Sequence, residues 1–228
     1  MGKNRRWLLV RRPAGGALAI GLAGLGAAAI SYGYLDRPLA VWIHRHLAAN
    51  PLFPWLTHIV DPLVPLALCA LVIAAATGAF GCRLGQGVRP VLGAAIAVLV
   101  AAAVKDELKW VFGRTWPETW IDGNPSYLRD GVYTFAWFHG GRGWSAFPSG
   151  HMTLLTAWLS ALWRWHPAVR WIGVLAIPLV GAGLLGANYH WLSDVICGAL
   201  LGAGIGLGIA AFVAGSPQPL AAGEESAP

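Results

Sequence analysis

Charged residues are scarce in this chain. Asp, Glu, Lys and Arg make up only 11% of its 228 residues, whereas 57% of the residues are hydrophobic. Soluble globular proteins carry about 25% charged residues, so this composition excludes an ordinary soluble domain and predicts a polytopic membrane protein. The formal net charge is +6, but the basic residues are dispersed and form no stripe with interleaved aromatics. We therefore expect no nucleic-acid partner.

Cysteine is also rare. The three cysteines are Cys69, Cys82 and Cys197. Their odd number and unrelated positions predict neither a disulfide framework nor a zinc site built from cysteine pairs. The helical HExxH pattern of zinc enzymes is missing from the sequence as well.

Long apolar runs, by contrast, are abundant. A transmembrane helix takes about 20 apolar residues, and the stretches that qualify are roughly 14–32, 57–79, 89–110, 149–165, 170–188 and 191–213. They predict an all-α fold, a polytopic six-helix transmembrane bundle with a long loop region between the third and fourth helices. Residues 1–215 would form a single integral-membrane domain, and residues 216–228 a disordered tail.

Two N-terminal segments have alternative interpretations. The basic residues and the apolar run at the start resemble a signal peptide, but the run from 14 to 32 is long enough to span, so we expect an uncleaved first helix. The segment 36–55 is polar and interrupted by prolines, and we expect it to lie at the membrane interface.

Lys and Arg residues predict the orientation, because they accumulate on the cytoplasmic side. If the N-terminus is cytoplasmic, that side holds Lys3, Arg5, Arg6, Arg11, Arg12, Arg83, Arg89, Arg164 and Arg170. Most of the others cluster between 105 and 142, in or beside the long loop. We expect a multi-pass protein of the plasma (inner) membrane, with both termini in the cytoplasm and the loop of about 110–148 facing the periplasm or exterior.

Three polar stretches lie where apolar runs end. They are KDELKWVFGRTWP (105–117), FPSGH (147–151) and NYHWLSD (188–194). In the orientation above, all three map to the outer side. Ionisable groups at such depth are usually functional, so we expect the three stretches to form one site.

The FPSGH stretch has the features of an anion site. Ser149 is a good N-cap after Pro148, which predicts a helix that begins there with free N–H groups and its positive dipole end toward the loop. Gly150 lets an anion approach the backbone closely. His151 adds a titratable imidazole in the first turn.

The other two stretches add a second imidazole and cations. His190 and Asp194 are four residues apart, so at a helix start the carboxylate can hold one ring nitrogen and leave the other free. Lys109 and Arg114 supply cations, and a guanidinium suits bidentate phosphate contact. Lys105, one turn before Lys109, is interpreted as structural.

Together these groups favour metal-free phosphoryl transfer. One imidazole would attack phosphorus, the other would protonate the leaving oxygen, and the cations would stabilise the equatorial oxygens. The alternative is a metal site made from His139, His151, His190 and Asp194. Because that set lacks the usual ligand spacings, we expect no metal and no cofactor.

The motifs resemble those of a known family, the type 2 phosphatidic acid phosphatases or lipid phosphate phosphatases, which share their site with vanadium haloperoxidases. The family's motifs read K-x6-R-P, P-S-G-H and S-R-x5-H-x3-D, and its membrane members have six helices. The resemblance covers about residues 50–213. The matching residues are Lys109, Pro117, Pro148, Ser149, Gly150, His151, His190 and Asp194.

The resemblance implies a role for most of these residues. His190 would be the nucleophile, Asp194 the acid that orients it, and His151 the general acid. The implied phosphate ligands are Ser149, Gly150 and Lys109.

Two arginines of the family pattern are out of register in this chain. Trp116 stands where the first motif has its arginine, and Gly183 and Leu184 stand where the third motif has Ser-Arg. We expect Arg114 to replace one arginine as a phosphate ligand. Further candidates are Arg142, Arg129 and Asn188.

The sequence therefore predicts a membrane lipid phosphatase that works through a phosphohistidine on a membrane lipid phosphate or diphosphate. Undecaprenyl diphosphate, phosphatidic acid, phosphatidylglycerol phosphate and phosphorylated lipid A all fit this chemistry. The alternatives are phosphoryl transfer from one lipid to another, and a non-catalytic carrier or binding protein on the same scaffold. The oligomeric state is not predicted.

Overall fold

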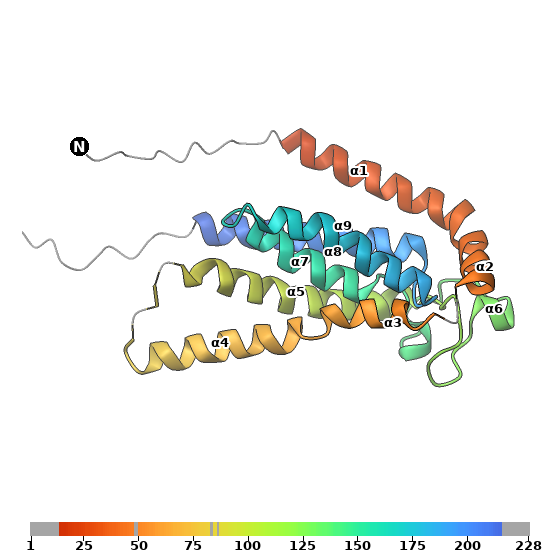
Figure 1. The fold of residues 1–228 in the computed structure, drawn as a ribbon, viewed down its shortest axis with the longest axis horizontal. Coiled ribbons are helices and arrows are strands. Elements are labelled where there is room, and N and C mark those ends of the chain that lie inside the picture. The colour runs from red at the N-terminus through yellow and green to blue at the C-terminus, as the bar shows by residue number, and fades with distance from the viewer. Residues whose placement is uncertain (1–13, 48–49, 83, 86, 216–228) are drawn as a thin grey trace, which may run out of the picture.

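The computed structural model describes residues 14–47, 50–82, 84–85 and 87–215, and every regular element among them is a helix (Figure 1). The tail expected over 216–228 and the basic residues before 14 lie outside these ranges. The α-helices are α1 (Ala14–Ile30), α2 (Asp36–His46), α3 (Leu52–Thr57), α4 (Leu63–Ala79), α5 (Val88–Phe112), α6 (Tyr127–Asp130), α7 (Gly150–Trp163), α8 (Val169–Gly186) and α9 (Leu192–Gly215). The all-α class is confirmed for this part of the chain.

Among the residues that the structure describes, five helical segments are long and apolar enough to cross a bilayer, so the chain is a membrane protein. They are Gly15–His46, Leu52–Ala79, Val88–Phe112, Val169–Gly186 and Leu192–Gly215. The remaining stretch expected to span, 149–165, forms α7, which has only 14 residues. At 1.5 Å per residue it is about 21 Å long, short of the roughly 30 Å hydrocarbon core. By length and composition, the six-span count is therefore not confirmed for the described residues.

The short helix α7 occupies the centre of the bundle. It packs against α5, α8 and α9, and most of its residues are buried, including the polar Thr153, Thr156 and Ser160. Their hydroxyls donate to backbone carbonyls one turn earlier at 2.6–2.8 Å. A helix surrounded by protein in this way meets little lipid and has no need to match the bilayer thickness.

The segment 36–55, expected to lie at the membrane interface, contains α2 and the start of α3. A π-helical turn at Ser31–Leu35 carries α1 directly into α2, which bends across the end of the bundle. Pro38, which lacks a backbone N–H, lies in the first turn of α2, directly after the π-helical turn. Figure 1 shows α2, α3 and α6 gathered at one end of the long helices, together with the loop that joins α5 to α7.

The crossing of α7 and α9 depends on glycine. A Cβ on Gly202 would lie 2.1 Å from the Thr153 carbonyl oxygen, and one on Gly206 would lie 2.1 Å from Ser160 Oγ. The two backbones therefore approach as closely as small residues permit, which is a common basis of helix packing in membranes. On the open face of α9, Gly204 has no atom within 4 Å of an added Cβ.

Glycine also sets where the loop 113–149 leaves α5. Gly113 ends the helix in the left-handed conformation with φ of 54°, and a Cβ there would lie 1.9 Å from the Ala136 carbonyl oxygen. The loop then returns alongside itself, with Thr115 N donating to Thr134 O at 3.2 Å. The indole of Trp191, just before α9, donates to Thr115 O at 2.8 Å and ties the loop to the bundle.

Replacing Gly202 with alanine should destabilise the protein by about 1–3 kcal/mol, because the added methyl group overpacks the α7–α9 crossing. The measurement is the thermal unfolding midpoint in detergent. Gly204→Ala is the matched control on the same helix, and its midpoint should be equal to or above that of the wild type, because alanine favours helix over glycine. Equal midpoints for the two variants would show that the crossing is not tightly packed.

Candidate active site

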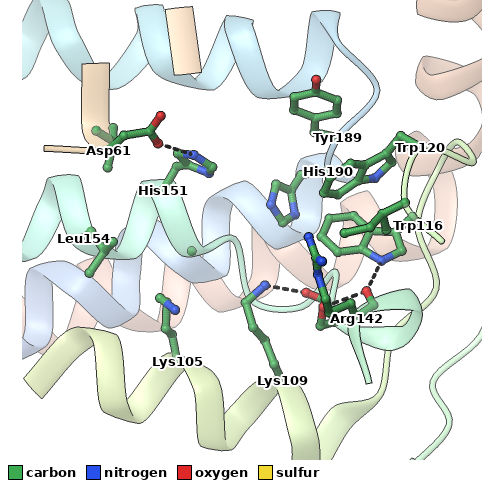
Figure 2. Close-up of a pocket in the computed structure, with 14 residues that line it drawn as sticks. Asp61, Lys105, Lys109, Trp116, Trp120, Arg142, His151, Leu154, Tyr189 and His190 are labelled. Atoms are coloured by element: carbon green, nitrogen blue, oxygen red, sulfur yellow. Dashed lines mark hydrogen bonds and ion pairs between the residues drawn. The ribbon is translucent and has the colours of Figure 1, made fainter. Parts of the chain in front are cut away.

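A cavity of about 380 Å³ opens at the loop end of the bundle. Lys109 reaches it from α5, Gly150 and His151 from the start of α7, and His190 from the residues just before α9 (Figure 2). The three polar stretches expected to form one site thus come together in the structure.

His190 is a buried residue of the cavity wall. Its side chain is 4% exposed, and its Nδ1 lies 3.4 Å from Asp194 Oδ2, which also accepts from Trp191 N at 3.0 Å. Burial lowers the pKa of His190 below its usual value, although Asp194 acts in the opposite direction. The imidazole is therefore neutral near pH 7, as a nucleophile must be.

Ser149 occupies the N-cap position of α7, as expected, but its hydroxyl does not cap the helix. Ser149 Oγ is buried, and within the described part of the chain it has no hydrogen-bond partner. A buried hydroxyl without a partner is costly, so its place beside Gly150 and the free N–H groups of the helix start suits an anionic ligand. The backbone N of Ser149 donates to Asp194 O at 3.1 Å.

Three cations surround the cavity. Lys109 Nζ donates to the Ser145 carbonyl oxygen and lies 5.5 Å from the centre of the Trp116 ring. Lys105, interpreted from the sequence as structural, also lines the cavity and pairs with Asp106. Arg142 stands at the rim with its side chain 75% exposed.

A family model described as the PAP2 superfamily matches residues 90–217, more than half of the chain. The chain belongs to the PAP2 superfamily. The resemblance seen in the sequence is thereby confirmed, and the assignment supports phosphatase activity on a phosphorylated substrate. No curated protein and no solved structure matches the chain. The matched region contains α5 to α9 and every motif residue of this PAP2 protein, whereas α1 to α4 precede it.

The two out-of-register positions of the PAP2 motifs have different environments. Trp116 lines the cavity, packs its ring 5.1 Å from that of His190, and donates from Nε1 to Arg142 O at 2.9 Å. Leu184 is fully buried in the hydrophobic core with Met152. The Trp116 indole therefore forms part of the cavity wall where the first motif has its arginine. Leu184, at the arginine position of the third motif, faces the hydrophobic core.

Arg114 does not line the cavity. Its guanidinium is 1% exposed and donates to Asp194 Oδ1 and, at 2.8 Å, to Asp36 Oδ2. Burial alone would lower the pKa of Arg114, but Asp194 and Asp36 outweigh it and raise the pKa. The geometry thus gives Arg114 a buried ion-pair role in place of the expected phosphate contact.

The other candidate phosphate ligands, Arg142, Asn188 and Arg129, lie in different environments. Of the three, only Arg142 lines the cavity. Asn188 is buried, with Nδ2 3.4 Å from both Ala40 O and Glu118 Oε2. Arg129 pairs with Asp130 and donates to loop carbonyls.

Asp61 is a cavity residue that the sequence interpretation missed. Its Oδ1 lies 3.4 Å from His151 Nε2, and its Oδ2 lies 2.7 Å from His58 Nδ1. It was passed over because it falls inside the apolar stretch 57–79. A carboxylate near the outer end of an expected span is itself a signal of function, and it could have identified Asp61.

The alternative metal set is not assembled. The His139 ring stacks on Trp144 at 4.3 Å and is not part of the cavity wall. Within the described residues, no three His, Cys, Asp or Glu side chains are grouped so that they could hold a metal ion.

The lowered pKa of His190 predicts a pH-dependent loss of stability. As pH falls through about 6.5, the ordinary imidazole value, the unfolded chain binds a proton that the folded protein does not, so the folded state loses stability. Between about pH 7.5 and pH 5.5 the thermal midpoint of the wild type should fall further than that of His190→Gln, which lacks the buried imidazole. Parallel pH profiles for the two proteins would contradict a neutral His190.

Proposed function

We propose that this PAP2 protein is a membrane phosphatase that removes phosphate from a lipid phosphate or diphosphate. The observation that carries the proposal is the convergence of His151 and His190, from two separate segments, on one cavity with Lys109 (Figure 2). Asp194 behind His190 completes the set of groups that phosphoryl transfer through a histidine requires.

The geometry suggests a role for each ring nitrogen. With His190 Nδ1 facing Asp194, Nε2 is the atom that attacks phosphorus, and the bond from phosphorus to the leaving oxygen breaks. His151 gives that oxygen a proton. A water then attacks the phosphohistidine and gives its proton to His151, so that inorganic phosphate leaves and both histidines return to their starting states.

Groups on two sides of the cavity stabilise the negative charge of the phosphoryl group during transfer. Lys109 supplies a cation within the cavity wall, and the start of α7 supplies free N–H groups with Ser149 Oγ beside them. The phosphoryl oxygens are thereby stabilised by fixed groups and need no reorganisation during the reaction.

The cavity wall also favours a lipid as the substrate. Next to the ionic groups it includes the apolar side chains of Val60 and Leu154. The neighbouring helix α4 exposes Leu66, Val72 and Ile73 by more than 60%, a surface suited to acyl or prenyl chains. A phosphorylated headgroup can therefore reach Lys109 while its tail stays in the bilayer.

Phosphate release from a panel of lipid phosphates and diphosphates in detergent, with EDTA present, tests the activity. We expect turnover by the wild type and a loss on the order of 10³-fold or more in His190→Ala, because the nucleophile is removed. His139→Ala is the matched control, since that histidine stacks on Trp144 outside the cavity wall, and it should retain activity. Vanadate, a mimic of five-coordinate phosphorus, should inhibit.

Three other results would point elsewhere. Wild-type protein that turns over no lipid but binds vanadate would be a non-catalytic carrier, the alternative favoured by Trp116 and Leu184 at the two arginine positions. Activity lost with EDTA would indicate a metal requirement. Phosphate moved to an added acceptor lipid, with none released, would identify a phosphotransferase.

We further propose that the protein lies in the plasma (inner) membrane with both termini in the cytoplasm and the cavity facing the periplasm. A membrane-impermeant maleimide should label Thr134→Cys in intact cells, because Thr134 is exposed in the loop after α5. Cys82 is exposed in the turn after α4 at the opposite end of the bundle. It should be labelled only after the cells are broken, and the reverse pattern would invert the orientation.

A further inference from the structure

A buried cluster of three charges lies behind His190. The Arg114 guanidinium bridges Asp194, which faces His190, and Asp36, which comes from α2. The side chains of all three are at most 1% exposed. Aromatic rings surround the guanidinium, with the centres of Tyr32 and Phe135 5.1 and 4.9 Å away.

The two oxygens of Asp194 have separate tasks. Oδ1 accepts from Arg114, while Oδ2 accepts from Trp191 N and faces His190 Nδ1. This division fixes the plane of the carboxylate, and the plane determines the tautomer and orientation of the imidazole. Arg114 therefore positions Asp194, and Asp194 in turn faces His190.

The same contact has an electrostatic drawback. A guanidinium next to Asp194 cancels much of the negative charge that would stabilise a positively charged or phosphorylated His190. Asp36, on the other side of the guanidinium, restores one net negative charge to the cluster. Without Asp36, Arg114 and Asp194 would form a neutral ion pair behind His190.

Asp36 accepts hydrogen bonds from several donors. Its Oδ1 accepts from Ser31 Oγ at 2.7 Å and from Ser193 N at 3.0 Å, and Tyr133 OH donates to its Oδ2 at 3.0 Å. Burying a third charge is expensive, and a buried ion pair adds little net stability. Stability alone therefore does not account for an aspartate at this position.

We propose that Asp36 is a positioning residue of the active site, which acts through Arg114 to keep Asp194 oriented and negatively charged against His190. The proposal rests on the proposed function. It makes α2, which lies before the region matched to the family, part of the catalytic apparatus.

Asp36→Asn tests the proposal because it removes the charge and keeps the shape. We expect kcat to fall by about tenfold or more with KM within about twofold, because Asp36 does not touch the cavity. Ser31→Ala is the matched control, since it removes one hydrogen bond to Asp36 but leaves the charge, and its kcat should stay within about threefold of the wild type.

The pH profile separates positioning from a merely structural role. The groups that face His190 are Asp194 from α9, Lys109 from α5, His151 from α7, and Arg114 beyond Asp194. Losing the Asp36 charge makes this surrounding more positive, which disfavours protonation of His190. The acid limb of the kcat/KM profile should therefore move to lower pH by about half a unit or more.

The titration of His190 can also be followed without substrate. NMR of protein labelled with ¹³C-histidine gives the His190 signal, assigned by its loss in His190→Gln, and its midpoint should be lower in Asp36→Asn than in the wild type or Ser31→Ala. An unchanged midpoint would overturn the proposal, as would a kcat loss matched by Ser31→Ala. Because this readout needs no turnover, it remains decisive even when no lipid is hydrolysed and the proposed function fails.

Discussion

Asp194 connects the three segments that form the active-site cavity. Its backbone oxygen accepts from Ser149 N at the start of α7, and its side chain accepts from Arg114 in the loop after α5. Its other carboxylate oxygen holds Trp191 N and faces His190. One aspartate thus links the start of α7, the loop after α5 and His190.

The cavity presents an unusual balance of charge and hydrogen bonding. With Trp116 and Leu184 at the two arginine positions, the cations of its wall are Lys105, Lys109 and Arg142. A lysine is a compact point charge and gives none of the bidentate geometry of a guanidinium. In the proposed reaction, directional contacts to phosphate would then come mainly from the start of α7 and Ser149.

The sequence predicted those site residues whose signal lies within one short stretch of the chain. Each of these signals lies at the end of one helix: the spacing of His190 and Asp194, the PSGH motif, and Lys109. The structure brings these residues together. Hydropathy also located the apolar helices, but it could not show that α7 has only 14 residues or that its polar side chains are buried among its neighbours. The mean hydropathy of a stretch depends on its composition alone and contains no information about what surrounds the helix.

The role of Arg114 could not be predicted, because it depends on partners far along the chain. Asp36 is 78 residues away and Asp194 is 80, and no local pattern links them. From the sequence Arg114 was a loop cation close to a motif position, and a phosphate contact was the simplest interpretation. Asp36 itself gave a usable signal, since a carboxylate at the end of an apolar helix is expected to face protein rather than lipid. A buried charge needs an opposite charge, and Arg114, which pairs with Asp194, also pairs with Asp36. The N-terminal helix and the nucleophile are therefore linked by charge balance, which explains how a segment outside the family motifs reaches the centre of the site.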